Sequence, residues 1–323
     1  MQPYKTYVRR VGLFVLAAFA LYPALFCLQL GALTESSRYI QEWFDVKMRY
    51  AQRAQGPKLV FVSGSNTLFG IDASELEARL KMPALNLGSH AGLGIHYILQ
   101  QAQQAVGAGD IVVLPLEYEQ YEERKWEEAL VDFIAARDPA YFAQLPVADQ
   151  LECIFAMPPK RLVKGVKARF VPDARNEDSA YDSKYLNANG DMTNNAYAKR
   201  TPAAALRANS KKAVFTADSC PEPQAAEALS HFIAFCRQKG ARVLATYPSY
   251  LCRDKAFHGA DLERVREIEA FYARQGVPVL GSYEDFLYDA DDFYDTIYHL
   301  NDVGKRKRTE QLLEYLRPYA LAH

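Results

Sequence analysis

The chain of 323 residues predicts an α/β fold with a central parallel sheet and one N-terminal transmembrane helix. Short apolar runs of four or five residues alternate with longer segments of helical periodicity, which is typical of βαβ units. One uninterrupted apolar stretch of about 20 residues lies near the N-terminus, long enough to cross a bilayer as a helix. The composition is that of an ordinary globular protein, with 50% hydrophobic and 24% charged residues.

The apolar stretch covers residues 11–30 and predicts a membrane anchor. Arg9 and Arg10 precede it, and the first charge after it is Glu35. Because basic flanks stay in the cytoplasm, we expect residues 1–34 to form a cytoplasmic tail and anchor, with the rest extracytoplasmic. A cleaved signal peptide is the alternative. It is disfavoured because no A-x-A-type site follows the run, which is also long for a signal peptide.

The formal net charge is −1, and no basic stripe indicates a nucleic-acid partner. No CxxC or Cys/His cluster has the spacing of a zinc site, so we expect no structural metal. We also expect no cofactor. Four cysteines follow the anchor and allow three full pairings, among which the sequence does not choose. Cys236 lies on an apolar helical stripe, whereas Cys220 and Cys252 lie in loop-like segments and are the better candidates for a disulfide.

Residues 35–56 predict a stalk helix, because Ile40, Trp43 and Phe44 recur near helical spacing. The main domain then covers residues 57–323. We expect five strands, at residues 59–62, 84–87, 110–114, 242–246 and 277–281. Helices are expected between and after them, at residues 75–81, 95–106, 223–239, 261–275 and 302–317. Asp72 or Ser74 is suited to cap the first of these helices, and Asn301 or Asp302 the last.

Residues 119–215 interrupt the alternation of strands and helices. The segment begins with a charged run at residues 122–128, which predicts a solvated face, and contains a turn-rich stretch at residues 187–195. We interpret it as an insertion, partly helical and partly irregular, that covers or lines the functional site.

Several candidate site residues follow directly after predicted strands. In an open parallel sheet, ligands bind at the carboxyl ends of the strands. His299 follows the fifth strand after a loop, and the first four strands are followed by Ser65, Gly88, Glu117/Tyr118 and Tyr247/Pro248. We therefore expect these segments to converge on one crevice.

The residue types in this crevice predict nucleophilic catalysis by a serine. Ser65 is the candidate nucleophile, His299 the base that takes its proton, and Asp295 the residue that orients the base. Backbone N–H groups near Ser65 and Gly88 would stabilise an oxyanion, and the glycine would let the backbone approach the substrate closely.

Three neighbouring residues are alternatives for these roles. Ser63 is a rival nucleophile, although its place on the strand predicts that it faces the sheet crossing. Asp292 is a poorer candidate than Asp295 for orienting His299, because it lies seven residues before the histidine. His90 follows Gly88 and could also reach the crevice.

This arrangement resembles the SGNH (GDSL-like) hydrolase superfamily over residues 57–120 and 215–320. The superfamily has a three-layer fold around a parallel sheet. Three short blocks carry the resemblance, in the order that the family has them: Gly64-Ser65-Asn66, Asn86-Leu-Gly88 and Asp295-Thr-Ile-Tyr-His299. By this resemblance the first block holds the nucleophile, the second a glycine of the oxyanion hole, and the third the Asp/His pair.

The chain departs from the family pattern in three places. Asp295 and His299 are four residues apart, where three is common, and no aspartate precedes the nucleophile. The family's Gly-x-Asn-Asp block is replaced by Pro115-Leu-Glu-Tyr118. The asparagine that would complete the oxyanion hole is therefore unassigned, and Tyr118 or Asn66 would have to serve.

These departures resemble a membrane-anchored subgroup that includes the alginate O-acetylation proteins and the teichoic-acid D-alanyl transfer protein. The resemblance implies one helix in the bacterial inner membrane, a periplasmic SGNH-like domain and a partner protein of the membrane-bound O-acyltransferase type. It implies further that Ser65 takes an acyl group, expected to be acetyl, and passes it to a hydroxyl of a cell-envelope or secreted polysaccharide.

Two other functions are consistent with the same sequence. A carbohydrate esterase or deacetylase would use the same residues and transfer the acyl group to water. A non-catalytic glycan-binding scaffold would account for the unusual Asp/His spacing and for the missing asparagine block.

Overall fold

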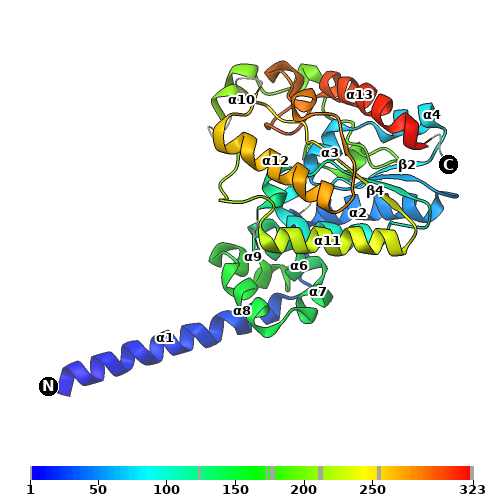
Figure 1. The fold of residues 1–323 in the computed structure, drawn as a ribbon. Helices are drawn as coiled ribbons and strands as arrows, with labels where there is room; N and C mark the ends of the chain where they lie inside the picture. Colours follow the sequence, from blue (N-terminus) through cyan, green and yellow to red (C-terminus); the bar gives the residue numbers. More distant parts are fainter. Residues whose placement is uncertain are drawn as a thin grey trace. The chain divides into compact units, whose positions relative to one another are not determined.

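The computed structural model describes residues 2–122, 125–171, 174, 179–209, 214–252 and 256–320 (Figure 1). The chain divides into two compact units. Unit 1 combines residues 1–41 with residues 126–178, and unit 2 combines residues 42–125 with residues 179–323. Unit 2 contains the sheet and every candidate site residue, whereas unit 1 is helical in the part that the structure describes.

The sheet of unit 2 is parallel throughout, as the sequence predicts. Among the described residues it has five strands: β1 (Leu59–Phe61), β2 (Ala84–Asn86), β3 (Ile111–Leu114), β4 (Arg242–Thr246) and β5 (Val279–Leu280). The strand order is β2-β1-β3-β4-β5, and Val60 of β1 pairs with Leu85 on one side and Val112 on the other. The chain reverses its direction of progress between β1 and β3, which is where such sheets bind ligands.

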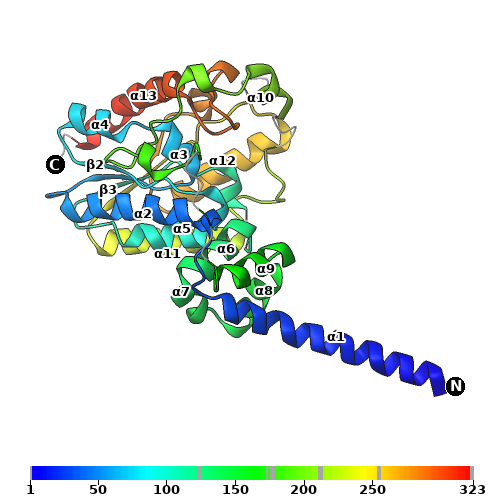
Figure 2. The ribbon, with the colours of Figure 1, turned by 180° about the vertical axis from the view of Figure 1, so that it is seen from behind.

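Helices cover both faces of this sheet. They are α3 (Ser65–Gly70), α4 (Ala73–Leu80), α5 (Gly94–Gln103), α10 (Ala203–Asn209), α11 (Pro223–Gln238), α12 (Gly259–Arg274) and α13 (Asp302–Ala320). Helices α5 and α11 pack together on one face, and α3, α4 and α13 pack together on the other (Figures 1 and 2). The sheet is buried on both sides, which explains why β1–β3 are uninterrupted apolar or buried runs.

Side-chain caps fix two helix starts next to the candidate site. Asp72 accepts a hydrogen bond from the backbone N–H of Glu75 (3.0 Å) and begins α4, one of the two predicted possibilities. Asn301 caps α13, since its Oδ1 accepts from the backbone N–H groups of Val303 (3.0 Å) and Gly304 (3.1 Å). Helix α13 continues three residues past the predicted end at 317, because a proline in the last turn removes only one hydrogen bond.

The predicted stalk helix is α2 (Glu35–Arg53). Its residues from Glu42 onward belong to unit 2, where Trp43 and Lys47 are buried. The indole of Trp43 donates a hydrogen bond to the carbonyl of Tyr181 (3.1 Å). This part of α2 is therefore a packed helix of the α/β unit.

The predicted insertion at residues 119–215 is divided between the units. Residues 126–178 belong to unit 1, and residues 179–215 belong to unit 2. Parts of it lie outside the described residues, namely 123–124 within the charged run, 172–173, 175–178 and 210–213.

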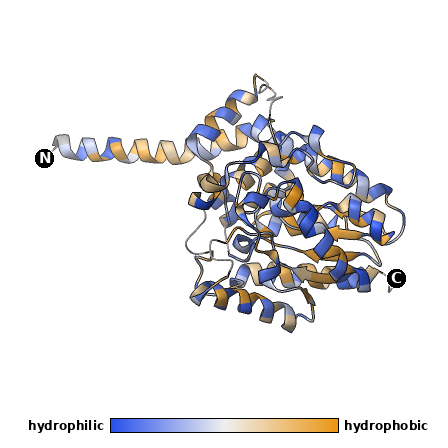
Figure 3. Cartoon of the chain, turned by 90° about the horizontal axis from the view of Figure 1, so that it is seen from above, coloured by the Kyte–Doolittle hydropathy of each residue, from blue (hydrophilic) through white to orange (hydrophobic). Residues whose placement is uncertain are grey.

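Unit 1 is built around the N-terminal helix. It contains α1 (Gln2–Gln29), α6 (Glu128–Arg137), α7 (Pro139–Gln144), α8 (Val147–Ala156) and α9 (Pro159–Ala168). Helix α1 carries most of the apolar stretch predicted as an anchor, visible as a mainly orange helix in Figure 3. Within the described part of the chain it is the one helix long and apolar enough to cross a membrane.

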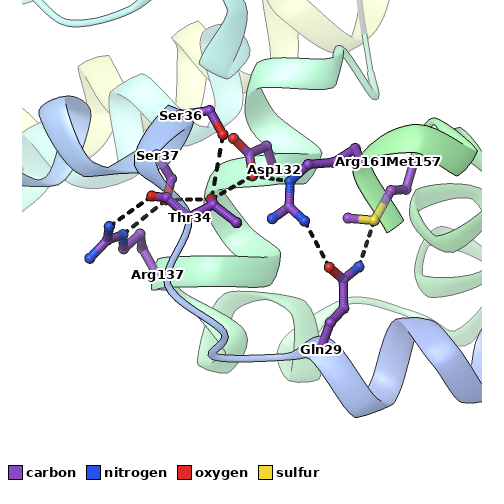
Figure 4. Close-up of polar contacts among 8 residues, drawn as sticks. All are labelled: Gln29, Thr34, Ser36, Ser37, Asp132, Arg137, Met157 and Arg161. Carbon is purple, nitrogen blue, oxygen red and sulfur yellow. Dashed lines mark hydrogen bonds and ion pairs between the residues drawn. The ribbon is translucent and has the colours of Figure 1, made fainter. Parts of the chain in front are cut away.

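A buried polar network joins the C-terminal end of α1 to α6 and α9 (Figure 4). Gln29 donates to the sulfur of Met157 (2.6 Å) and accepts from Arg161 (2.8 Å). Arg161 forms a buried ion pair with Asp132, which also accepts a hydrogen bond from Thr34 (3.1 Å). The charges compensate each other, so the network is compatible with burial and fixes α9 against α1.

All five cysteines are free thiols, so the predicted disulfide between Cys220 and Cys252 is wrong. Cys220 is packed in the core, and the thiol of Cys252 donates to the carbonyl of Ala256 (3.3 Å). Loop-like sequence placed both residues near the surface, but it carried no information on the direction of their side chains. Cys236 is buried on α11, as its position on the apolar stripe predicts.

Substituting Asn301→Ala should lower the free energy of unfolding by about 2 kcal/mol or more, because buried hydrogen-bonding groups lose their partners. Asn301 is fully buried, and besides its capping bonds it donates to the carbonyls of Asp291 (2.7 Å) and Phe293 (3.1 Å). Urea unfolding followed by circular dichroism measures the change. Arg306→Ala, an exposed position on the same helix, is the control and should be nearly neutral.

Candidate active site

Ser65 is the first residue of α3, immediately after the loop that leaves β1. It is half-buried, whereas its neighbours Gly64 and Asn66 are buried. Neither the hydroxyl nor the backbone N–H of Ser65 forms a hydrogen bond with any described residue. At the start of a helix the N–H groups have no partner within the helix, so Ser65 can present both a nucleophilic oxygen and an N–H donor.

The rival serine, Ser63, is excluded from this role by its surroundings. It is fully buried, and its hydroxyl bonds to the hydroxyl of Thr67 (2.6 Å) and accepts from the amide of Asn66 (2.8 Å). Ser63 therefore holds the loop together from inside.

The carboxylate of Glu117 holds the N-terminal end of α3. Its two oxygens accept hydrogen bonds from the backbone N–H groups of Gly64 (2.9 Å) and Asn66 (2.8 Å), the residues on either side of Ser65. Burial raises the pKa of Glu117, and the hydrogen bonds from Asn66 and Gly64 oppose that rise. A Cβ on Gly64 would lie 2.5 Å from this carboxylate, so the contact requires glycine.

A buried arginine holds the same turn from the other side. Arg308 of α13 donates to the carbonyls of Asn66 (3.1 Å) and Tyr247 (3.1 Å) and to the hydroxyl of Ser249 (3.2 Å). Burial lowers the pKa of Arg308 to about 10. The peptide groups that flank Ser65 are thus fixed by a buried carboxyl group at their N–H groups and by a cation at a carbonyl.

The side chains of Asp295 and His299 lie in contact. Nδ1 of His299 and Oδ1 of Asp295 are 2.7 Å apart, so a spacing of four residues brings the two side chains together. The backbone N–H of His299 also donates to the hydroxyl of Thr296 (3.1 Å), which fixes the intervening turn. The alternative partner, Asp292, instead forms an ion pair with Lys307 (2.6 Å).

Tyr181 extends this pair to a third side chain that the sequence did not indicate. Its hydroxyl donates to Oδ2 of Asp295 (2.5 Å), while the first oxygen serves His299. Burial alone would raise the pKa of Asp295, but the hydrogen bonds from His299 and Tyr181 and the charge of His299 lower it overall. Asp295 is therefore ionised near neutral pH and suited to stabilise an imidazolium.

Ring stacking brings His299 to the helix that carries Ser65. The imidazole stacks on Phe69 of α3, with ring centroids 4.2 Å apart and an interplanar angle of 9°. Phe69 follows Ser65 by four residues, so the two side chains lie on the same face of the helix. No hydrogen bond joins Ser65 to His299, and Nε2 of His299 has no partner among the described residues. Such contacts are often long before substrate binds.

The geometry gives Gly88 a different role from the predicted one. Its N–H donates to Oδ1 of Asn86 (3.0 Å), and its carbonyl accepts from the ammonium of Lys47. A Cβ at this position would lie 2.4 Å from the backbone nitrogen of Leu68, so glycine is needed for close packing against α3. The sequence predicted that Gly88 would let substrate come close to the backbone, but in the structure the close neighbour of Gly88 is the backbone of α3.

Lys47 is a further residue that the sequence did not indicate. It is fully buried, and burial lowers its pKa to about 7, against the opposing charge of Asp191. Its contact with the carbonyl of Gly88 fixes the loop after β2 to helix α2.

Neither side chain proposed to replace the family's asparagine is placed for that role. The amide of Asn66 donates to Ser63 (2.8 Å) and to the carbonyl of Pro115 (2.9 Å), which uses both of its hydrogens. Tyr118 is buried in an aromatic cluster with Tyr250 and Phe257, and its hydroxyl has no partner among the described residues. The backbone N–H of Ser65 is the donor that the geometry leaves open for an oxyanion.

His90 lies close enough to His299 for their charges to interact. Burial first, and then the charge of His299, lowers the pKa of His90. Its Nδ1 accepts a hydrogen bond from the backbone N–H of Gly92 (3.0 Å), which caps a short 3₁₀ turn. Among the described residues, no group of three or more His, Cys, Asp or Glu side chains is placed to hold a metal ion.

The comparisons with known proteins add no relative to this picture. No protein-family model matches the chain, and no curated protein matches it.

Substituting Asp295→Asn should reduce the rate at which Ser65 reacts with an activated ester by about 10²-fold or more, because the imidazolium loses its anion. Asp292→Asn is the matched control. It removes the neighbouring carboxylate, which pairs with Lys307, and should leave the rate nearly unchanged. Stopped-flow measurement of the first turnover compares the two variants. Equal rates for both would assign Asp295 a purely structural role.

Proposed function

We propose that this chain transfers acyl groups through a covalent ester on Ser65. The observation that carries the proposal is the position of Ser65 on α3, on the same helix face as the phenylalanine against which the paired imidazole of His299 stacks. The order of the blocks along the chain supports an SGNH-like site, and the parallel sheet is consistent with the three-layer fold of that superfamily.

In the first step, Oγ of Ser65 attacks the carbonyl carbon of an ester or thioester donor. Nε2 of His299 takes the hydroxyl proton, and Asp295 stabilises the resulting imidazolium. The N–H of Ser65 donates to the oxyanion of the tetrahedral intermediate. The bond between the carbonyl carbon and the leaving group then breaks, and the leaving group takes the proton from His299.

In the second step, a polysaccharide hydroxyl attacks the acyl-serine. His299 accepts the hydroxyl proton and returns it to Oγ of Ser65 when the acyl–serine bond breaks. The products are an acylated glycan and the free enzyme, so no external oxidant, reductant or cofactor is needed. We propose acetyl as the acyl group.

The cellular setting proposed for this reaction is the outer face of the bacterial inner membrane. The length and apolar character of α1 and the basic residues before residue 11 support a single-pass anchor with the α/β unit in the periplasm. A membrane-bound O-acyltransferase is the proposed partner that delivers the acyl group across the membrane.

A non-catalytic scaffold that binds glycan is the second candidate. The absence of a hydrogen bond between Ser65 and His299, and the internal use of the Gly88 N–H, favour it. An esterase on the same site differs from the transferase only in using water as the acyl acceptor.

Treating the full-length protein in detergent with a fluorophosphonate should add one phosphonyl group, seen by intact mass. Ser65→Ala should abolish the adduct, because Ser65 is the serine that His299 activates in the proposed mechanism. Ser74→Ala, on the neighbouring helix, should label like wild type.

Two further results would contradict parts of the proposal. No adduct on well-folded wild-type protein would favour the scaffold. An adduct together with release of free acetate from an activated acetyl ester, and no transfer to added oligosaccharides, would favour the esterase.

A further inference from the structure

Helix α1 is covered by protein over its last third only. Every residue from Val11 to Leu21 is exposed, whereas Tyr22 is half-buried and Phe26 and Gln29 are buried. The helices that cover α1 belong to unit 1, as does α1 itself.

The uncovered apolar part of α1 is too short to cross a bilayer alone. Residues 11–21 extend about 16 Å along the helix axis, compared with a hydrocarbon core of about 30 Å. Shifting the span toward the N-terminus would draw Arg9 and Arg10 into the hydrocarbon, where an arginine near the centre costs about 2.5–3.5 kcal/mol. The covered part, from Tyr22 to Leu30, must therefore also lie within the membrane.

The end of α8 packs directly against this covered part. Phe155 contacts Phe19 and Tyr22 of α1, with ring centroids 5.5 Å and 5.8 Å apart. The hydroxyl of Tyr22 donates to the carbonyl of Met157, in the turn between α8 and α9. Phe155 thus lies at the depth of Phe19 and Tyr22, in the half of the bilayer nearer the C-terminal end of α1.

Helix α8 presents an exposed apolar stripe at the same place. Val147, Leu151 and Phe155 are spaced four residues apart, and 73%, 47% and 46% of their surfaces are exposed. Glu152, the residue after Leu151, is exposed about 100° further round the helix. A contiguous apolar stripe on a water-facing helix is uncommon, but it is normal where lipid is the solvent.

Helix α9 adds a basic stripe beside exposed apolar side chains. Lys160, Lys164 and Lys167 recur at helical spacing, next to Val163 and Phe170, which are 68% and 72% exposed. Lysine stems pack along apolar surface while their ammonium groups reach the level of lipid phosphates. This combination is typical of helices that lie in the membrane interface.

The α8–α9 pair is rigidly fixed to α1. A Cβ on Gly165 would lie 1.5 Å from Oε1 of Gln29, so the side chain of Gln29 packs directly against the backbone of α9. Gln29 also accepts from Arg161, whose ion pair with Asp132 is buried (Figure 4). The depth of α1 in the membrane therefore determines the depth of α8 and α9.

We propose that α8 and α9 form a hairpin embedded in the extracytoplasmic leaflet, with the Val147–Leu151–Phe155 stripe among the acyl chains and the α9 lysines at anionic headgroups. The occupant of this surface is the lipid bilayer itself, because the stripe is continuous with the apolar surface of α1. The inference depends on the proposed anchoring by α1 and is independent of the chemistry proposed for Ser65.

The test uses full-length protein in vesicles of phosphatidylcholine and phosphatidylglycerol. Leu151→Trp is compared with Glu152→Trp, a matched control on the same helix. Both variants carry Trp126→Phe, because the indole of Trp126 donates a hydrogen bond to Glu152 (3.0 Å), and the signal of Trp126→Phe alone is subtracted. Replacing the phosphatidylcholine by its acyl-brominated form should quench the tryptophan introduced at 151 at least about twofold more than the one introduced at 152. Acrylamide in the water should show the reverse order.

Equal quenching by bromolipid at the two positions, or stronger acrylamide quenching at 151, would overturn the inference. The latter result would make the stripe a water-exposed surface for a partner protein. Flotation of the wild-type protein with the vesicles tests the anchor separately, and fluorophosphonate labelling tests the serine, so failure of one claim is distinguishable from failure of the others. Circular dichroism confirms that both variants are folded.

Discussion

The position of Ser65 depends on two hydrogen bonds from the backbone to the buried carboxylate of Glu117. A buried N–H group that lost its hydrogen-bond partner would cost about 1–3 kcal/mol, so both bonds matter for the stability of this loop. They tie the end of β3 to the start of α3, the two segments that flank the switch point of the sheet. Because Glu117 occupies the N–H groups on both sides of Ser65, the N–H of Ser65 itself is left available.

The remaining contacts of the site are arranged around this loop. Arg308 donates a hydrogen bond to the carbonyl of Asn66 in the same turn. Phe69, one turn further along α3, stacks on the imidazole of His299. Asp295 bonds to Nδ1 of the imidazole, and Tyr181 in turn donates a hydrogen bond to Asp295. Helix α3 therefore carries the nucleophile and also supports the base, so a shift of this one short helix would disturb both.

The strands could be predicted from the sequence because short apolar runs are a local pattern. Ser65, Asp295 and His299 could be chosen as candidate site residues because polar residues after such runs are also visible locally. The sequence places Glu117 just past the third strand and in a block that departs from the family pattern, but it does not indicate what the carboxyl group contacts. Its function arises from contact between two loops some 50 residues apart, which no periodicity encodes. Gly88 was recognised as a glycine that needs space, but the close neighbour is α3, which only the folded chain shows.

The most direct test of this account is the rate at which a fluorophosphonate modifies Ser65 in Glu117→Gln, compared with Glu227→Gln, an exposed position on α11. Glutamine keeps the size of the side chain but turns an NH₂ group toward one of the two N–H donors. The account predicts a fall of about tenfold or more for Glu117→Gln, about 1.4 kcal/mol in activation free energy, in a variant that remains folded. Glu227→Gln should react at the wild-type rate. Equal rates for the two folded variants would contradict the claim that Glu117 positions the nucleophile.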